Sequence, residues 1–360
     1  MHEKNWKSDM TWNAEKLDEL RTLFSDKDGG TMHDPEFARI AGHIFRDGGR
    51  RQFPYAGHPT LLDAPAMVLG SSDDDLAKLQ VALYGMPMDL GVTNRGGARF
   101  GPRALRGIER MGPYNDVLHC APVHEMGVAD IGDVPFKSRF DLATSHSDIE
   151  AFVGRLVEAG VMPLGVGGDH SVSHPVLRAI GARRAVGMVH IDAHCDTGGP
   201  YEGEKFHHGG PFRNAVLDGV LDPTRTIQIG IRGSAAYIWE FSRMSGMTVI
   251  EAHRIGELGI SAIVEMARKV VGDGPTYLSF DIDSLDPAFA PGTGTPEAGG
   301  FTMREALALV RGFKGVNFVG GDVVEVAPAY DPTTNTAQNG SQILFELLSL
   351  MQFSPSLPAR

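Results

Sequence analysis

The stretch VHIDAHCDT, residues 189–197, places chemically active side chains at every second position after a short apolar run. Side chains two residues apart along an extended strand point to the same side, so Asp192, His194 and Asp196 are expected to converge. Two carboxylates and an imidazole facing one point are costly to bury unless a cation lies between them. The spacing therefore predicts a metal site. Cys195 lies between His194 and Asp196 in the sequence, so we expect its side chain to point to the other side of the strand, away from this site.

Three other segments carry ionisable residues of the same kinds at predicted strand ends. GVGGDHS places His170 after an apolar run and two glycines, LSFDIDSLDP supplies Asp281 and Asp283, and DVVEVAP places Glu325 among valines. Four aspartates with two histidines form an oxygen-rich ligand set, which suits Mn²⁺, Ni²⁺, Co²⁺ or Fe²⁺ better than a thiolate-rich zinc site would. Four carboxylate charges also roughly balance two divalent cations, and a water between two such ions loses a proton near neutral pH.

The elements that must position these residues alternate along the chain between apolar runs and amphipathic stretches. The runs predicted as strands are QVALYGMP, VMPLGVGG, AVGMVHID, RTIQIGIR, MTVIEA, PTYLSFDID and VNFVGGDVVEV. The stretches predicted as helices are ALRGIERM, DIEAFVGRLVEAG, HPVLRAIGA, RNAVLDGV, SAIVEMARKVVG, MREALALVRGF and AQNGSQILFELLSLM. This alternation predicts an α/β fold with a mainly parallel sheet flanked by helices on both faces. Ligands of such sheets bind beyond the carboxyl ends of the strands, where the candidate residues fall.

The first part of the chain differs from the rest, so we divide it into an N-terminal extension at residues 1–55 and one α/β domain at residues 56–360. The extension is polar, with helices expected around Asn13–Phe24 and Pro35–Phe45. It is expected either to pack on the main domain or on a neighbouring subunit, or to form a solvated arm.

Composition excludes several classes of function. The formal net charge is −12 and no run of Lys or Arg stands out, which argues against nucleic-acid binding and mildly favours cationic substrates. No apolar run is long enough to span a membrane, and the first residues, MHEKNWKSDMTW, lack the apolar core of a signal peptide. Two cysteines, Cys120 and Cys195, imply no disulfide framework. We therefore expect a soluble cytoplasmic protein without a membrane partner.

Five separated motifs resemble those of the ureohydrolase family, which contains arginases and agmatinases, and they occur in the family's order. They are GGDHS, DAHCDT, HHGGPFRNA, SFDIDSLDPAFAPGTGTPEAGG and DVVEVAPAYDPTTNTA. NRGGARFGPRALR, near residue 94, adds a sixth motif of the agmatinase kind. The resemblance covers roughly residues 55–355 and is closest to the agmatinase-like branch, which includes guanidinobutyrase, guanidine hydrolase and metformin hydrolase-type enzymes. It implies a three-layer arginase-type fold for residues 56–360.

The resemblance also implies a cofactor of two divalent metal ions, Mn or Ni. Carried over motif by motif, one ion would be held by His170, Asp192, Asp196 and Asp281. The other would be held by His194, Asp192, Asp281 and Asp283. Asp192 and Asp281 would then bridge the two ions.

Three further roles follow from the same resemblance. The proton-carrying histidine falls on His208, the carboxylate that binds the guanidinium on Glu325, and a neighbouring substrate-binding hydroxyl on Thr295. Asp196 is expected to help hold the substrate cation. A glutamate within VVEV would be costly to bury unpaired, and a planar guanidinium is the bidentate partner that stabilises it. An imidazole at position 208 can protonate a leaving amine.

Four ionisable residues near these positions are not expected to bind metal or substrate. His190 lies deeper in its strand than Asp192 and is expected to be a hydrogen-bonded core histidine. His207 precedes the HG pair and is expected to contact solvent. Asp169 and Asp286 lie in motifs rich in glycine or proline, so we expect them to tie down backbone.

The implied reaction is attack of hydroxide on a guanidinium carbon, which releases urea and an amine. The substrate class favoured by the sequence is agmatine or another small guanidino compound. The loop TGGPYEGEKFH carries Glu202 and Glu204, and Lys205 is its one obvious receptor for a carboxylate, which disfavours arginine. Guanidine, or an alkylated biguanide such as metformin that would give guanylurea and an amine, is the alternative.

Two hypotheses from other functional classes remain open. Zinc deacetylases share the arginase fold but use one metal, and the presence of His170, Asp196 and Asp283 argues against that class. The chain could instead be a non-catalytic subunit of a mixed oligomer, which the intact ligands, His208 and Glu325 disfavour. The resemblance implies a homo-oligomer, a trimer or hexamer, or a hetero-oligomer with a paralogous subunit.

Overall fold

The computed structural model describes residues 12–25, 32–44, 56–69, 75–109 and 113–359. The chain divides into two compact units, Met1–Phe53 and Pro54–Arg360. The first unit contains α1 (Ala14–Phe24) and α2 (Pro35–Ile44), close to the predicted positions. The side chain of Asn13 caps α1 by accepting a hydrogen bond from the Lys16 amide at 2.8 Å. Phe45, the predicted end of the second helix, lies outside the described residues, and the predicted boundary at residues 55/56 stays a prediction.

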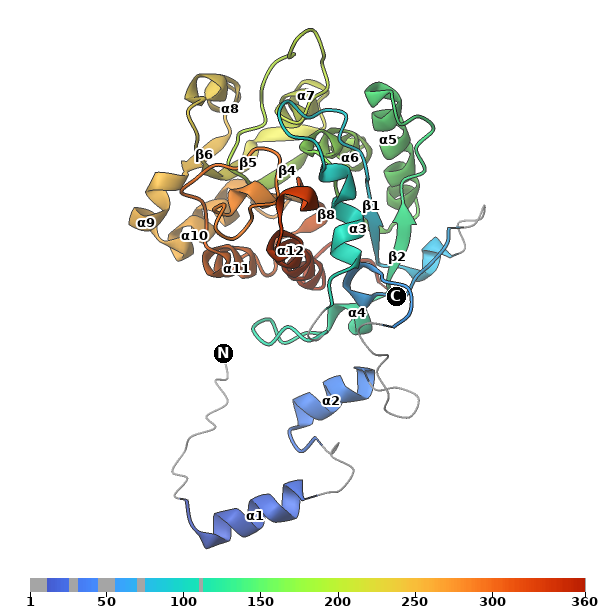
Figure 1. Cartoon of the computed structure of the whole chain (residues 1–360), viewed down its shortest axis with the longest axis vertical. Coiled ribbons are helices and arrows are strands. Elements are labelled where there is room, and N and C mark those ends of the chain that lie inside the picture. Colours follow the sequence, from blue (N-terminus) through green and yellow to red (C-terminus); the bar gives the residue numbers. More distant parts are fainter. Residues whose placement is uncertain (1–11, 26–31, 45–55, 70–74, 110–112, 360) are drawn as a thin grey trace. The chain divides into compact units, whose positions relative to one another are not determined.

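A parallel sheet forms the centre of the second unit (Figure 1). In the part of the chain that the structure describes, eight strands lie in the order β2-β1-β3-β8-β7-β4-β5-β6, and each neighbouring pair is parallel. The strands are β1 (Val81–Gly85), β2 (Val128–Asp133), β3 (Met162–Val166), β4 (Val186–Ile191), β5 (Leu221–Ile231), β6 (Thr248–Glu251), β7 (Thr276–Asp281) and β8 (Phe318–Val324). Every residue of β1, β3, β4 and β7 is buried, as expected for parallel strands covered on both faces.

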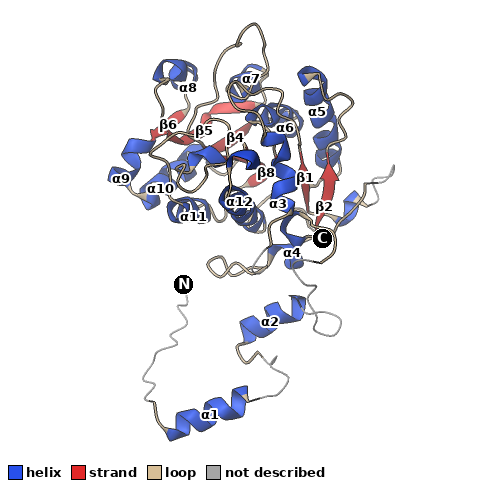
Figure 2. Cartoon of the chain, viewed as in Figure 1, coloured by secondary structure: helices blue, strands red, loops and turns tan. Residues whose placement is uncertain are grey.

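Helices cover both faces of this sheet, which confirms the predicted three-layer α/β fold (Figure 2). One layer consists of α5 (Leu142–Glu158), α6 (Ser173–Gly181) and α7 (Pro211–Leu217). The other layer consists of α3 (Gly101–Arg106), α10 (Ile260–Val271), α11 (Met303–Arg311) and α12 (Asn335–Met351). A separate hydrophobic core forms between the sheet and each layer.

Among the described residues of the second unit, one strand and three α-helices were not predicted from the sequence. Strand β2, with the sequence VADIGD, lies at an edge of the sheet, and its last two residues are exposed. It therefore lacks the continuous apolar run from which the other strands were predicted. Helices α4 (Pro122–Glu125), α8 (Glu240–Ser245) and α9 (Ile255–Leu258) are four to six residues long, too short to display a helical period.

Each predicted helix of the second unit has a counterpart, and the largest differences in bounds are at α5 and α3. Helix α5 begins at Leu142, ahead of the predicted Asp148, because the Asp141 side chain caps it by accepting from the Thr144 amide at 2.9 Å. Helix α3 ends at Arg106, where Gly107 follows. None of the helices in the described part of the chain is both long and apolar enough to cross a membrane.

The strand order positions the candidate site. Strands β3, β8, β7 and β4 are neighbours in the sheet, and all four point the same way. Their carboxyl ends therefore meet at one edge, although the strands are far apart in sequence. His170 follows β3, Asp192 follows β4, Asp281 ends β7 and Glu325 follows β8.

Candidate metal centre and active site

The His170 ring occupies the middle of the first group of predicted ligands. Its Nδ1 atom lies 3.1 Å from Asp192 Oδ2, 2.9 Å from Asp196 Oδ2 and 3.2 Å from Asp281 Oδ2. Among the described residues, this buried nitrogen has no aligned hydrogen-bond partner. A nitrogen that faces three carboxylate oxygens without aligning on any of them is arranged as a ligand to a shared cation would be.

A second group of predicted ligands surrounds His194. Its Nδ1 atom lies 3.1 Å from Asp283 Oδ2 and 3.4 Å from Asp192 Oδ1. Backbone amides fix the carboxylates: the Asp283 amide donates to Asp281 Oδ1 at 2.8 Å, and the Ala193 amide donates to Asp283 Oδ1 at 3.2 Å. Asp192 contacts both histidines, so the structure brings all six predicted metal ligands into two groups that share one carboxylate.

The charge of this cluster indicates what it could hold. Asp192, Asp281 and Asp283 are at most 2% exposed and Asp196 is 8% exposed. Burial raises the pKa of Asp281 well above its usual value, and repulsion from Asp283 and Asp192 adds to the rise. Carboxylates packed so closely away from water are stable only with compensating positive charge. The donor set, oxygen-rich with one nitrogen per group, fits two divalent cations.

Removing metal should make the stability of the protein depend on pH. Burial alone lowers the pKa of His170 and His194, but the surrounding carboxylates outweigh it and raise both pKa values well above about 6.5. Folded metal-free protein then holds protons that the unfolded chain has released. Stability from these groups is present below about pH 6.5 and is lost as pH rises through the raised pKa values.

We therefore expect the melting temperature of chelator-treated protein to fall between about pH 6 and pH 9. The fall corresponds to about 1.4 kcal/mol per pH unit for each extra proton bound by the folded state. The raised pKa of Asp281 acts in the same direction. Protein reloaded with Mn²⁺ is the control and should show a flatter profile. Equal pH profiles for the metal-free and reloaded samples would contradict the assignment of these ligands.

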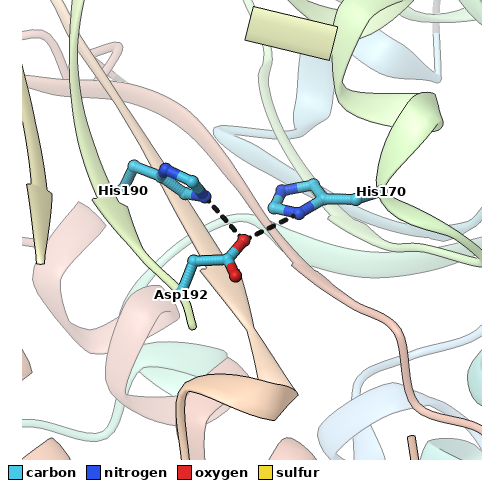
Figure 3. Close-up of side chains that lie close together, drawn as sticks. All are labelled: His170, His190 and Asp192. Carbon is cyan, nitrogen blue, oxygen red and sulfur yellow. Dashed lines mark hydrogen bonds and ion pairs between the residues drawn. The ribbon is translucent and has the colours of Figure 1, made fainter. Parts of the chain in front are cut away.

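His190 lies beside the cluster, and its ring is turned toward Asp192 (Figure 3). Its Nε2 is 2.7 Å from Asp192 Oδ2, and its Nδ1 is 3.0 Å from the side-chain amide of Gln228. His190 forms a possible metal-binding group with His170 and Asp192, but both of its ring nitrogens already have partners. It is thus the hydrogen-bonded core histidine that was predicted. Cys195 points away as expected, into a small apolar cluster.

Glu325 and His208 form a second part of the site next to the metal ligands. Glu325 Oε1 accepts a hydrogen bond from the His170 amide at 2.9 Å and contacts His208 Nδ1 at 2.9 Å. Glu325 Oε2 is buried and has no partner among the described residues. Both Glu325 (φ 63°) and Asp196 (φ 51°) have left-handed backbone, which is uncommon away from glycine and is concentrated at functional sites.

The protonation of His208 is set by opposing neighbours. Burial acts to lower its pKa, whereas Glu325, Asp196 and Asp169 raise the pKa of His208 to about 9. On the other side of the ring, Nε2 lies 2.6 Å from the Thr93 hydroxyl, and the Thr93 amide donates toward Nε2 at 3.2 Å. That amide opposes a second proton on the ring. An imidazole between these influences is suited to exchange a proton near neutral pH.

The remaining predicted residues have defined places. Thr295 donates from its hydroxyl to Asp283 Oδ2 at 3.3 Å, so it lies against a metal-ligand candidate, and its contact with substrate stays a prediction. Asp169 accepts from the amides of Gly91 and Ser171. Asp286 accepts from those of Ala288 and Gly299. Both aspartates tie down backbone, as predicted.

One expectation about this region is wrong. His207, predicted to contact solvent, is 8% exposed and its Nε2 lies 2.8 Å from the Gly199 carbonyl. The loop after Asp196 folds back, so that Gly198 donates to the carbonyl of Gly209 at 2.7 Å and encloses His207. The position of His207 before the HG pair did not predict its burial, because the burial depends on how this loop closes.

Sequence reasoning missed residues that hold the predicted ones in place, such as Thr93 against His208 and Ser279 against His170. Ser279 lies two residues before Asp281 and so shares its face of β7. That spacing was the available signal.

Fold, ligand groups and the Glu325–His208 pair together define a metal-dependent hydrolase of the α/β class, and comparison with known proteins agrees. The chain belongs to the arginase family, which it matches over residues 79–349.

Individual relatives within this family are named as hydrolases of guanidino compounds. The chain is 48% identical to guanidinopropionase of Pseudomonas aeruginosa over 82% of this chain and 92% of that protein. It is 43% identical to the human mitochondrial guanidino acid hydrolase over 75% of this chain and 78% of that protein. The structure resembles proclavaminate amidino hydrolase from Streptomyces clavuligerus with a TM-score of 0.78 and 35% identity, over 83% of this chain and 98% of that one. The protein is therefore a ureohydrolase, an enzyme acting on guanidino compounds.

Proposed function

We propose that this enzyme uses a dinuclear metal centre to cleave a carbon–nitrogen bond of a small guanidino compound, with release of urea and an amine. The observation that carries the proposal is Glu325 Oε2, a buried carboxylate oxygen without a partner among the described residues, beside the ligand cluster. A guanidinium group supplies the planar pair of N–H donors that such a carboxylate lacks.

His170, Asp192, Asp196 and Asp281 would hold one cation, and His194, Asp192, Asp281 and Asp283 the other. Two divalent cations held there would lower the pKa of a water molecule and so supply a nucleophile near neutral pH. Mn²⁺ and Ni²⁺ both suit this set of nitrogen and oxygen donors. A one-metal zinc deacetylase site would leave His170 Nδ1, and the carboxylates that it faces, without a metal ion to bind.

The chain's own groups supply orientation and proton transfer. Glu325 binds the guanidinium and, through its other oxygen, holds His208 by a contact of 2.9 Å. His208 delivers a proton to the departing nitrogen, which would otherwise leave as a poor anionic leaving group. Asp196 adds negative charge on the side where the substrate cation binds.

Short guanidino acids are the substrates that we favour within this class. Relatives at 48%, 41% and 43% identity are named guanidinopropionase, guanidinobutyrase and guanidino acid hydrolase. Glu202 and Glu204 belong to the loop whose residues disfavoured arginine and left agmatine possible. Both are exposed, so solvent screens their charges. Agmatine is the second candidate, because the chain is 44% identical to a mitochondrial agmatinase of Gallus gallus.

Urea release by the purified chain tests this proposal. The chain is loaded with Mn²⁺ or Ni²⁺ and offered 3-guanidinopropionate, 4-guanidinobutyrate, agmatine, arginine, guanidine and metformin, with amine release measured alongside. We expect the highest kcat/KM for a guanidino acid. Guanylurea from metformin would identify the biguanide alternative. No product from any substrate would favour a non-catalytic subunit and contradict the proposal.

The role of Glu325 gives a prediction of its own. Glu325→Gln should keep metal and fold, since a glutamine oxygen can still accept from the His170 amide. It loses a charged contact with the guanidinium, worth about 1.5–3 kcal/mol, so kcat/KM should fall about 10–100-fold.

A matched control is Glu346→Gln, which alters a buried glutamate paired with Arg311 at 2.7 Å. This substitution should lower stability and leave kcat/KM for the metal-loaded enzyme nearly unchanged. Unchanged kinetics in Glu325→Gln would remove this carboxylate from the substrate site.

Assembly and location are also proposals. We favour a homo-oligomer, a trimer or hexamer, with a hetero-oligomer containing a paralogous subunit as the alternative, and light scattering of the purified chain distinguishes them. The thiols of Cys120 and Cys195 are free and buried, which supports a reducing compartment such as the cytoplasm.

A further inference from the structure

A row of fully buried polar side chains crosses the sheet directly beneath the metal ligands. Gln228 on β5 is in register with His190 on β4, His190 with Ser279 on β7, and Ser279 with Asp322 on β8. All four are 0% exposed. Residues in register on neighbouring parallel strands face the same side of the sheet. His190 and Ser279 precede Asp192 and Asp281 by two residues, so the row lies on the ligands' own face.

One end of the row is connected to His170. Ser279 donates from its hydroxyl to Asp322 Oδ1 at 2.7 Å, because a carboxylate can only accept. The Ser279 oxygen is therefore free to accept from His170 Nε2–H, which lies 2.8 Å away. With its proton on Nε2, the imidazole presents a lone pair at Nδ1, the atom that faces the three aspartates. The chain Asp322–Ser279–His170 thus fixes both the tautomer and the direction of the ring.

Asp322 is a buried carboxylate that lacks a cationic side chain within ion-pair distance among the residues described. Its other donors are hydroxyls: Ser173 at 2.5 Å and Tyr277 at 2.7 Å, both to Oδ2. Hydroxyl donors stabilise a carboxylate, but they do not balance its charge. The candidate cation-binding groups around His170 are linked to Asp322 through Ser279. A positive charge held there would be felt by Asp322 through low-dielectric protein.

The other end of the row acts on Asp192 in the same way. The side-chain amide of Gln228 donates to the Cys195 carbonyl at 2.6 Å, an acceptor only, so its nitrogen is correctly placed. The same amide lies 3.0 Å from His190 Nδ1, which must then accept, and the proton resides on Nε2. His190 Nε2–H donates to Asp192 Oδ2 at 2.7 Å. Each end of the row therefore directs one ligand of the first metal group.

We propose that this row is a positioning device for the metal centre, in which Asp322, through Ser279, holds the His170 ring in the metal-binding orientation and supplies negative charge behind it. The inference rests on the proposed dinuclear centre and adds residues that are not themselves ligands. Ser279 and Tyr277 have different parts in it: the Ser279 hydroxyl contacts both Asp322 and His170, whereas the Tyr277 hydroxyl donates to Asp322.

The test compares two substitutions that each remove one hydroxyl donor to Asp322. Ser279→Ala also removes the partner of His170, whereas the control Tyr277→Phe does not. The dissociation constants for Mn²⁺ are measured by competition with a chelator, and melting temperatures are measured on metal-free samples. We expect Ser279→Ala to weaken one of the two Mn²⁺ sites, the one that contains His170, about 10–100-fold, the usual effect of losing such a partner, and Tyr277→Phe to change either site less than about threefold.

The metal-free samples separate positioning from packing. If the hydroxyls serve only to solvate Asp322, both variants lower the melting temperature of the metal-free protein and neither changes Mn²⁺ affinity more than the other. Equal affinities in Ser279→Ala and Tyr277→Phe therefore overturn the inference.

Asp322→Asn provides an independent variant if Ser279→Ala folds poorly. It keeps the size of the side chain and removes the charge, so Mn²⁺ affinity should fall by at least about tenfold, while unchanged affinity contradicts the proposed role. Wild-type protein that binds no Mn²⁺ or Ni²⁺ would be a failure of the metal centre itself. If wild-type protein binds two ions, and Ser279→Ala and Asp322→Asn bind them with the wild-type affinity, this inference alone fails.

Discussion

Replacement of Asp281 by asparagine is expected to abolish urea release and to lower the bound metal below two ions per chain. Asp281 Oδ2 faces His170 Nδ1 at 3.2 Å, and its carboxylate is proposed to bridge both cations. Asparagine keeps the oxygen that accepts from the Asp283 amide at 2.8 Å, so the turn after β7 is retained. The loss should therefore come from the missing charge and ligand, and it should be visible both in metal analysis and in turnover.

Asp286→Asn is the matched control for this prediction. Asp286 lies in the same motif but serves backbone amides, including that of Gly299 at 2.8 Å. Its substitution should lower stability without removing metal.

Asp192→Asn should behave like Asp281→Asn, because Asp192 contacts both His170 and His194. Near-normal metal content and turnover in both ligand variants would show that these carboxylates do not bridge a metal pair.

His208→Ala should slow turnover by about 10²–10⁴-fold, the usual contribution of a positioned general acid or base, while both metal ions stay bound. The ring touches Glu325 and Thr93, but none of the predicted metal ligands at coordinating distance. The decrease should appear in kcat, because the imidazole acts on the leaving nitrogen during the reaction.

The neighbouring His207→Ala variant provides a local comparison. His207 Nε2 lies 2.8 Å from the Gly199 carbonyl. Its loss therefore loosens the same loop but leaves in place His208, the imidazole proposed to protonate the leaving nitrogen. We expect a much smaller decrease in kcat than for His208→Ala. Loss of metal from His208→Ala, or equal kinetic defects in the two variants, would mean that His208 is not the proton carrier.

Much of the metal site could be predicted from the sequence because the candidate ligands directly follow apolar runs that form neighbouring parallel strands. Asp192, His194 and Asp196 after one run, and Asp281 and Asp283 after another, converge in the structure. The strand period is not the reason, since β4 ends at Ile191, a 3-10 helix begins at Ile282, and Asp196 has left-handed backbone. The fold class followed from the same runs, since strands that are apolar on both faces must be covered twice.

Features that depend on strand order or loop shape could not be predicted in this way. The connection from Asp322 to His170 exists because β7 and β8 are neighbours with Ser279 opposite Asp322, and no local pattern encodes that register. The burial of His207 depends on a loop closed by backbone hydrogen bonds. Edge strand β2 was missed because its exposed end lacks the apolar pattern of the central strands.

The most direct test of a dinuclear guanidino hydrolase is a titration of metal-free protein with Mn²⁺, and in parallel with Ni²⁺, while urea release from 3-guanidinopropionate is recorded. Four buried aspartates and two histidines in groups that share Asp192 predict that activity rises until two equivalents of metal are bound per chain and then stays constant. A plateau at one equivalent, or urea release that is independent of added metal, would contradict the two-metal centre.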